Sequence, residues 1–423
     1  MDLRLLLLIA TAACAPLLPD QPDLQEPPAP QSGAPDTSAT PTASVTPTEQ
    51  MAFDTWRESF LDRRAGANRE AWARELAGLT PDQRVVDRDR SQPEFSSSAG
   101  SYISRAMTAD RIARGRDLIG ASPWMRDIES QYGVPREILV AIWAQESGFG
   151  RIQGDFDVVR SLATLAWEGR RRDWAEGQLV DALRIVTEGR RDRARLLGSW
   201  AGAMGQTQFM PDNYLRLGRD HDGDGFVDIW GSDRDALASA ANLLATAGWR
   251  RGQGWGAEVI LPEGFDYSLA ETDRAPWTTW RARGVRRSDG GEFTAAEASE
   301  EALILLPAGA YGPAFLALPN HYVIRRYNNS VSYALSVGLL GDAMMGRPSL
   351  TRAWPEEEPM SRDQRFAAQR ALLALGYDPG GIDGVIGSGT RGALRRWQQA
   401  RGLLADGHLT AALAERLRAE AGL

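Results

Sequence analysis

The carboxyl group of Glu146 stands where its acidity should change. It follows the apolar run 138–145, whose pattern predicts a helix with Pro135 at its first position, and it precedes the segment 147–150 (Ser-Gly-Phe-Gly), which should end that helix. Partial burial at such a helix end raises the pKa of a carboxyl group. An acid still protonated near neutral pH can protonate the oxygen of a glycosidic bond. An ordinary glutamate at a helix end gives the same segment, so further motifs must decide.

The segment 202–211 (Gly-Ala-Met-Gly-Gln-Thr-Gln-Phe-Met-Pro) has residue types that suit a sugar ligand. Its glycines permit close approach of the backbone to a ligand. The amides of Gln206 and Gln208 can donate to and accept from sugar hydroxyl and N-acetyl groups. Phe209 and Met210 offer apolar walls. A glycine-rich loop around a buried methionine is the alternative interpretation.

Aromatic and amide side chains also lie close together in 326–334 (Arg-Tyr-Asn-Asn-Ser-Val-Ser-Tyr-Ala). The rings of Tyr327 and Tyr333 can stack on the C–H faces of a sugar, while the Asn329 amide binds its hydroxyls. Tyr333 can equally be a core residue of a helix that starts near Ser330.

The acidic loop 220–230 predicts a calcium site. Asp220, Asp222 and Asp224 occupy positions 1, 3 and 5 of an EF-hand loop, and the carbonyl of Phe226 fits position 7. The usual glutamate at position 12 is missing, because Gly231 is there. We therefore expect modest affinity and a structural Ca²⁺. An acidic turn that binds nothing is the alternative.

Composition excludes several other functions. The net charge of −8 gives no reason to expect binding to nucleic acid. Three histidines and one cysteine leave too few ligands for a Cys/His zinc site, and a disulfide within the chain is impossible. A length of 423 residues allows two or three domains. We expect a monomer.

The first residues predict export. The apolar stretch at 1–13 is too short to span a bilayer but fits a signal peptide, and its small residues lead into Cys14. This end resembles a bacterial lipobox, although Thr11 stands where an aliphatic residue is usual; a plain signal peptide with an incidental cysteine remains open. The resemblance implies a lipidated Cys14 and a periplasmic lipoprotein, and Ala15 is compatible with the outer membrane. Residues 15–50, rich in Pro, Ser and Thr, predict a disordered tether.

The remaining pattern predicts a mostly α fold of the α+β class. Helical periodicity covers 56–61, 71–79, 109–132, 157–167, 174–188 and 234–247, and strand-like runs cover 259–261 and 322–326. We expect a catalytic domain at 51–350, a Pro- and acid-rich linker at 351–360 and a small domain at 361–423.

The small domain predicts three short helices. Ser361 and Gln364 form a capping box, and Gly376 should end the first helix. The motifs Leu-Gly-Tyr (375–377), Ile-Asp-Gly-Val-Ile-Gly (382–387) and Thr-Arg-Gly-Ala-Leu-Arg-Arg-Trp-Gln (390–398) resemble the three-helix peptidoglycan-binding domain. A generic helical cap is the alternative.

The three central motifs together, in their order, resemble the lytic murein transglycosylase B family. This resemblance implies a lysozyme-like catalytic domain and a carbon–oxygen lyase. Such an enzyme cleaves the MurNAc–GlcNAc β-1,4 bond of peptidoglycan and leaves a 1,6-anhydro-MurNAc end. It makes Glu146 the catalytic acid and implies a late acidic calcium ligand, for which Asp235 is the first candidate and Asp233 the second. It implies substrate contacts at Ser147, Gln208, Phe209, Tyr327 and Tyr333.

A single marked carboxyl group suits this reaction. Glu146 would first protonate the leaving oxygen and then, as a carboxylate, take the proton of the C6 hydroxyl of the same sugar, whose attack is effectively unimolecular. Ordinary glycosidases use two carboxyl groups. A muramidase of similar fold that uses water, and a non-catalytic wall-binding lipoprotein, remain open alternatives.

Overall fold

The computed structural model describes residues 46–91 and 98–423, so the predicted leader, Cys14 and nearly all of the tether lie outside the described residues. Within these ranges the helices are α1 (Pro47–Arg64), α2 (Arg69–Leu76), α3 (Gln83–Ser91), α4 (Ala99–Ala106), α5 (Ala109–Ala121), α6 (Met125–Tyr132), α7 (Arg136–Ser147), α8 (Val158–Glu168), α9 (Arg172–Thr187), α10 (Pro211–Leu217), α11 (Asp233–Thr246), α12 (Trp277–Ala282), α13 (Ala295–Ala298), α14 (Pro319–Ile324), α15 (Val331–Met344), α16 (Arg362–Ala374), α17 (Ser388–Ala400) and α18 (Ala411–Ala421). The strands are β1 (Phe156–Asp157), β2 (Leu197–Gly198), β3 (Gly256–Ile260), β4 (Ala275–Pro276), β5 (Arg286–Arg287), β6 (Glu301–Leu305) and β7 (Ala314–Ala317). The predicted mostly helical fold with small β elements is confirmed. None of the described helices is both long and apolar enough to cross a bilayer.

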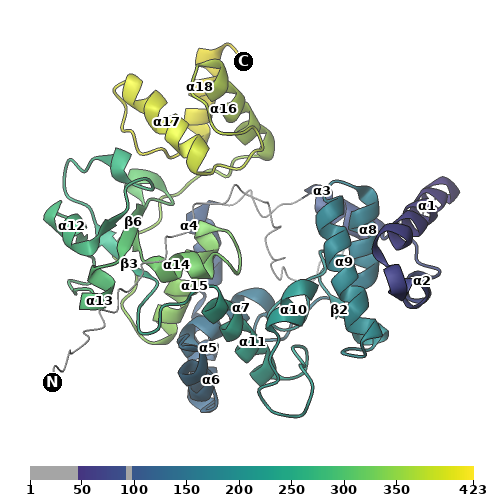
Figure 1. Cartoon of the computed structure of the whole chain (residues 1–423). Coiled ribbons are helices and arrows are strands. Elements are labelled where there is room, and N and C mark those ends of the chain that lie inside the picture. Colours follow the sequence, from purple (N-terminus) through teal and green to yellow (C-terminus); the bar gives the residue numbers. More distant parts are fainter. Residues whose placement is uncertain (1–45, 92–97) are drawn as a thin grey trace, which may run out of the picture.

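The largest hydrophobic core is helical, and α7 lies inside it. Residues 138–144 of α7 are all buried, as expected for a helix that is apolar on every side. The neighbouring α15 packs closely on α7 (Figure 1). Gly341 of α15 permits this approach, because a Cβ there would lie 3.2 Å from the backbone oxygen of Glu137. The two helices that carry the first and third motifs are therefore in direct contact.

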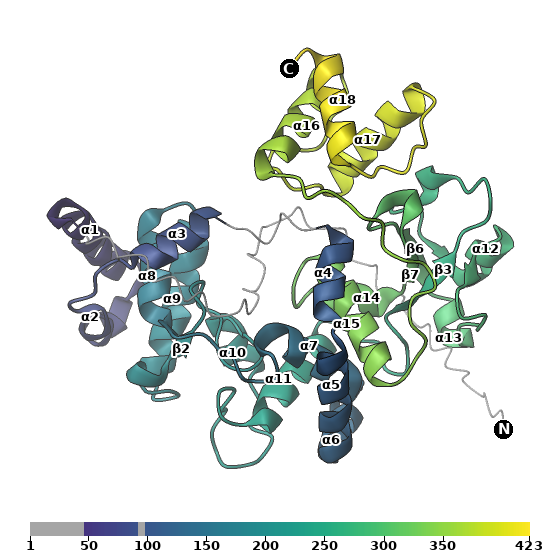
Figure 2. The same ribbon diagram turned by 180° about the vertical axis from the view of Figure 1, so that it is seen from behind.

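A second core surrounds a five-stranded antiparallel sheet with the order β4–β6–β7–β3–β5. Its central strands β6, β7 and β3 lie side by side in Figure 2. Trp280 of α12 is fully buried there, and its indole N–H donates to the carbonyl of Ala302 at 3.1 Å. Sequence analysis located only part of this sheet, at 259–261. The remaining strands are short, and β6 and β7 are apolar on both faces, so they lack the alternation that marks a half-buried strand.

Two predicted elements were wrong. The segment 322–326, predicted as a strand, is the end of α14 and the turn after it, because Pro319 begins a helix at its favoured first position. The single helix predicted for 109–132 is two helices, α5 and α6. Ser122 and Pro123 separate them, since proline disfavours the helical conformation of the residue before it.

The C-terminal residues form a third core from α16, α17 and α18. The predicted capping box is present: the Ser361 hydroxyl accepts from the backbone N–H of Gln364, whose side chain accepts from the N–H of Ser361. Gly376 follows α16 with φ +85°, a left-handed conformation that suits glycine. We call the residues around the five-stranded sheet, from β3 to β7, the sheet lobe. The three C-terminal helices lie against this lobe in both views (Figures 1 and 2).

The predicted linker has no regular secondary structure but is anchored at several points. The Glu258 carboxylate accepts from the backbone N–H groups of Thr351 and Arg352 at 2.8 and 3.0 Å. The Trp354 ring stacks on Phe315 of β7 with centroids 6.1 Å apart. The linker is therefore fixed on the sheet lobe along part of its length.

A buried ion triad joins the C-terminal helices to the sheet lobe. Both Arg391 and Arg395 of α17 donate to Oε2 of Glu271 at 2.7 Å. Burial opposes ionisation of Glu271, but the two guanidinium charges outweigh it and hold its pKa below the ordinary value. A second contact runs from the backbone N–H of Ala310 to the Asp406 carboxylate at 3.0 Å. Two lobes are thus docked by oriented, largely buried polar groups.

We expect Glu271→Gln to loosen this docking. The change leaves two poorly solvated arginines without their counter-charge, which should cost about 3 kcal/mol. Calorimetry should then resolve a separate transition for the C-terminal helices, and protease cleavage within 346–361 should accelerate. The control Glu263→Gln removes an exposed carboxylate from the same lobe. Equal cleavage rates in the two variants would contradict the proposed strength of the triad.

Candidate active site

Glu146 occupies the last turn of α7, as the sequence predicts. The next helix-ending residue, Gly148, has φ +58°, and its N–H donates to the carbonyl of Ala144 at 3.1 Å. Phe149 also has a positive φ of +64°, which is uncommon for a residue other than glycine. The chain therefore turns sharply directly after Glu146, away from the helix axis.

Glu146 is only 3% exposed. Burial raises its pKa to about 8, against a smaller lowering by a hydrogen bond from Tyr333. The Tyr333 hydroxyl donates to Oε1 of Glu146 at 2.5 Å, and burial raises the pKa of Tyr333 well above its ordinary value, so the phenol keeps its proton. Among the described residues, no charged group contributes to the pKa shift of Glu146. Burial, and not the charge of a second carboxylate, therefore sets the pKa of Glu146.

Ser147 connects the first motif to the second. It is fully buried, and its hydroxyl donates to the backbone carbonyl of Gln206 at 2.5 Å while it accepts from the N–H of Gly150 at 2.8 Å. The hydroxyl hydrogen is therefore already used. Contact of Ser147 with a substrate stays a prediction; the bonds formed here hold the turn after Glu146 in place.

The amide of Gln206 is likewise held by protein groups. Its oxygen accepts from the indole N–H of Trp143 at 2.9 Å, and its nitrogen donates to the Asp233 carboxylate at 2.9 Å. This role of Trp143 was not predicted from the sequence, and Asp233 was predicted only as a second calcium candidate. A residue buried in α7 next to the catalytic candidate, with a polar indole N–H that needs a partner, was the available signal.

Gln208 lies on the tight turn of the second motif. It has φ +50°, and its side-chain nitrogen donates to the carbonyls of Gln153 and Gly205 at 3.1 and 2.9 Å. Phe209 is buried, with its ring centroid 6.1 Å from that of Tyr327. The turn is thus built by its own side chains as well as by its glycines.

The third motif meets the second through Tyr327, whose hydroxyl donates to the carbonyl of Thr207 at 2.5 Å. Met210 is half-buried at the start of α10. Asn329 is exposed and accepts a hydrogen bond from Arg325 at 2.6 Å. The structure therefore brings Glu146, Tyr333 and Tyr327 together, and Asn329 is not among their hydrogen-bond partners. The substrate contacts at all these positions stay predictions.

The acidic loop brings three of its predicted ligands together. Single carboxylate oxygens of Asp220, Asp222 and Asp235 lie within 4.8 Å of one another. Asp235 is fully buried; its Oδ1 accepts from the backbone N–H groups of His221 and Asp222 at 2.8 and 3.3 Å, and its Oδ2 accepts from that of Asp228 at 2.8 Å. A carboxylate oxygen has two lone pairs, so Oδ2 keeps one for a cation. An all-oxygen set of three carboxylates suits Ca²⁺.

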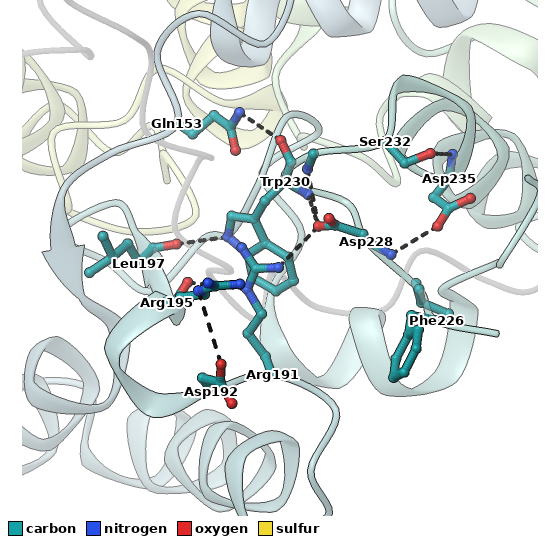
Figure 3. Close-up of polar contacts among 12 residues, drawn as sticks. Gln153, Arg191, Asp192, Arg195, Leu197, Phe226, Asp228, Trp230, Ser232 and Asp235 are labelled. Atoms are coloured by element: carbon teal, nitrogen blue, oxygen red, sulfur yellow. Dashed lines mark hydrogen bonds and ion pairs between the residues drawn. The ribbon is translucent and has the colours of Figure 1, made fainter. Parts of the chain in front are cut away.

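The other predicted ligands lie differently. The Asp224 carboxylate is exposed and accepts from the N–H of Phe226 at 2.8 Å, and the Phe226 ring is 64% exposed. Asp228, two residues after Phe226 in the acidic loop, accepts a hydrogen bond from Arg191 at 3.2 Å (Figure 3). The roles of Asp224 and of the Phe226 carbonyl stay predictions.

The acidic loop is tied to the active-site motifs. The amide of Gln153 donates to the carbonyl of Trp230 at 3.0 Å (Figure 3), and the N–H of Gln206 donates to the carbonyl of Ile229 at 2.9 Å. The Trp230 indole N–H donates to the carbonyl of Leu197 at 3.0 Å. The acidic loop is therefore hydrogen-bonded directly to the turn that carries Gln206 and Gln208.

Two protein families match the chain. The family described as a transglycosylase SLT domain matches residues 52–342, and a peptidoglycan binding domain family matches residues 361–417. The first match covers well over half of the chain, and the geometry around Glu146 agrees with it. The protein belongs to the transglycosylase SLT domain family.

Solved structures and a curated relative give the same picture. SltB3 from Pseudomonas aeruginosa, solved with NAG-NAM-pentapeptide and with NAG-anhNAM-pentapeptide, is 47% identical, with TM-scores of 0.82 and 0.81; each match covers 86% of this chain and 99% of that chain. Escherichia coli Slt35 in complex with calcium is 26% identical, with a TM-score of 0.60, over 72% of this chain and 96% of that chain. The membrane-bound lytic murein transglycosylase B of Escherichia coli (strain K12) is 34% identical over 221 residues, 50% of this chain. The chain spans 58% of the length of that curated relative.

We expect Glu146→Gln to stabilise the fold at neutral pH. The folded pKa of about 8 lies above the ordinary value of 4.5, so between these values the folded state binds one more proton than the unfolded state and stability falls as pH rises. Glutamine removes this penalty. The difference in free energy of unfolding, variant minus wild type, should be about 2–4 kcal/mol larger at pH ~7.5 than at pH ~4. Urea denaturation at the two pH values measures the difference, and a pH-independent gap would contradict the raised pKa.

Proposed function

We propose that the protein is a lytic transglycosylase that cleaves the MurNAc–GlcNAc β-1,4 bond of peptidoglycan without water and leaves a 1,6-anhydro-MurNAc end. The observation that carries this proposal is the buried Glu146 carboxyl group, whose pKa of about 8 keeps it protonated at neutral pH. Membership of the transglycosylase family supports it, as does the likeness to SltB3, whose complexes contain NAG-NAM-pentapeptide and its anhydro counterpart.

In the proposed reaction Glu146 acts twice. As an acid it protonates the glycosidic oxygen while the bond to the anomeric carbon of MurNAc breaks. As a carboxylate, with the Tyr333 hydroxyl donating to it, it then accepts the proton of the C6 hydroxyl as that oxygen bonds to the same anomeric carbon. Protons and bonds balance, and no water is consumed. The C6 hydroxyl is held on the reacting sugar, so its attack outpaces that of solvent.

The site favours this route over hydrolysis by a water-using muramidase. A hydrolase of the usual kind needs a second carboxyl group as base or nucleophile near the first. Such a group would shift the pKa of Glu146 by its charge. In the described residues that shift has only two causes, burial and Tyr333. A non-catalytic wall-binding protein would have no reason to keep a carboxyl group dry at this cost in stability.

The remaining features fit an enzyme held at the cell wall. We propose that residues 361–423 bind peptidoglycan, in accord with the family match at 361–417. We also propose that a lipidated Cys14 and the tether at 15–50 anchor the catalytic domain in the periplasm, at the outer membrane. The membrane-bound curated relative supports an anchored location.

We expect Glu146→Gln to abolish cleavage while the fold is kept. Glutamine cannot supply the proton, and loss of general acid–base catalysis should lower the rate about 10²–10⁴-fold or more. The assay is mass spectrometry of soluble products from isolated murein sacculi. The wild type should give products ending in 1,6-anhydro-MurNAc, lighter by one water than reducing ends. The control Glu70→Gln removes an exposed carboxylate on α2 and should leave the products unchanged. Reducing ends would indicate a hydrolase, and no products would indicate a binding protein.

We further propose that Ca²⁺ binds the acidic loop through Asp220, Asp222 and Asp235 as a structural ion. Their converging oxygens support it, as does the calcium complex of Slt35. Asp224 and the Phe226 carbonyl would complete the ligands. The ion would neutralise mutual repulsion among the carboxylates, and the bonds from this loop to Gln206 would carry the added order to the active site.

We expect Ca²⁺ to raise the thermal midpoint of the protein. A ligand present at about 100 times its dissociation constant adds about 2.7 kcal/mol to stability. Differential scanning calorimetry with millimolar CaCl₂ and with chelator measures this effect, and Asp220→Asn/Asp222→Asn should remove it. The control Asp54→Asn replaces a carboxylate on α1 by an amide and should leave the effect of Ca²⁺ on the thermal midpoint unchanged. A midpoint independent of Ca²⁺ in the wild type would refute the site.

A further inference from the structure

Three arginines lie together beside the turn that follows Glu146. The guanidinium group of Arg114 on α5 lies 5.3 Å from the ring centroid of Phe149. The Nε of Arg151 donates to the carbonyl of Gly148 at 2.9 Å. Arg111, one turn before Arg114, is close enough to Arg151 for the two charges to repel. The turn thus has three positive charges along one side.

These charges have no carboxylate partner among the described residues. Asp110 and Asp117, the acidic residues within four positions of Arg114 on α5, form no ion pair with it in the described part of the chain. Arg111 is half-buried, and burial and the charge of Arg151 lower its pKa. Elsewhere in the described chain Arg171 is paired with Asp89, whereas the buried Arg365 donates to the carbonyls of Gly384 and Met360. Of the three, Arg111 is the one that is partly desolvated, and an anion near it would offset that cost.

Each guanidinium also has donors to spare. Arg111 uses one N–H to bond the carbonyl of Ala106 at 3.2 Å, and Arg151 bonds the carbonyl of Gly148. A guanidinium carries five N–H donors in a planar fork that matches a carboxylate. Arg114 and Arg151 are exposed, so their remaining donors are accessible to a ligand.

The cluster is close to Glu146 in the chain but does not act on its pKa. Arginine charges do not contribute to the shift of the Glu146 pKa, which stays at about 8. An anion could therefore bind the arginines without changing the protonation of the acid. A separate anion site on the flank of the cleavage site is the arrangement needed for a substrate with a charged branch.

We propose that Arg114 and Arg151, supported by Arg111, bind carboxylates of the stem peptide on the sugar that Glu146 attacks. This inference rests on the proposed function. The stem is joined through its amino end to the lactyl group of MurNAc, so its C-terminal carboxylate is free. The scissile bond and the stem belong to the same sugar, so a stem bound by these arginines would extend from the sugar at Glu146 along the turn 148–151.

The test compares two soluble glycan substrates that carry pentapeptide stems, one with free carboxylates and one with the carboxylates converted to methylamides. The wild type should prefer the charged substrate. Arg114→Gln/Arg151→Gln should lower the ratio of kcat/KM between the charged and amidated substrates about tenfold, mainly through KM, as expected for two partly exposed charge-assisted contacts. Added salt should weaken the preference of the wild type.

Two controls separate charge recognition from structure. Arg114→Lys/Arg151→Lys keeps both charges and should retain most of the preference, and Arg64→Gln removes an exposed arginine on α1 and should leave the ratio unchanged. An unchanged ratio in the double Gln variant, or an equal fall on both substrates, would overturn the inference. Anhydro products from the wild type with no charge preference would overturn it while leaving the proposed function intact. Wild-type protein that cleaves neither substrate would reject both.

Discussion

The exclusion of water from the Glu146 carboxyl group is the constraint on which the rest of the site depends. A charge at this position is disfavoured because α7 and α15 pack around it, and the Tyr333 hydroxyl supplies the polar contact that it receives. The hydrogen bond connects residues 187 positions apart. Glu146 is therefore buried and hydrogen-bonded to Tyr333 only when the first and third motifs are assembled. Its raised pKa thus depends on completion of the helical core.

The second motif serves the same constraint from the other side. Ser147 and Trp143 hold Gln206, and Tyr327 holds the carbonyl of Thr207, although the buried Thr207 hydroxyl has no hydrogen-bond partner among the described residues. These bonds restrict the turn of the second motif to one geometry beside the acid. The network extends through the Gln206 backbone to the acidic loop, where a cation would act at a distance from the chemistry. Positioning and reaction are thus assigned to different residues.

Sequence alone predicted much of this arrangement, for physical reasons. The apolar run before Glu146 predicted a buried helix, and the glycine at 148 predicted its end. Burial of the Glu146 carboxyl group followed from these two predictions. The capping box of Ser361 and Gln364 and the glycine at 376 similarly marked the two ends of α16. The sheet lobe was missed because its strands are short and gain stability from pairing across long stretches of chain. The hydrogen-bond partners of Gln206 could not be predicted either, since they depend on which side chains packing brings together. The strand predicted at 322–326 was wrong because its β-branched residues favour strands locally while Pro319 and the packing against α15 favour a helix.

The triad of Glu271, Arg391 and Arg395 affects how the protein can bind a long polymer. A module on a flexible tether samples a range of separations from its neighbour, and its ligand experiences an average effective concentration. A module docked through buried charges offers one separation only. A strand that reaches both surfaces must then span a fixed number of disaccharide repeats between them. The fixed docking of the two lobes would therefore set the length of the fragments that the protein releases.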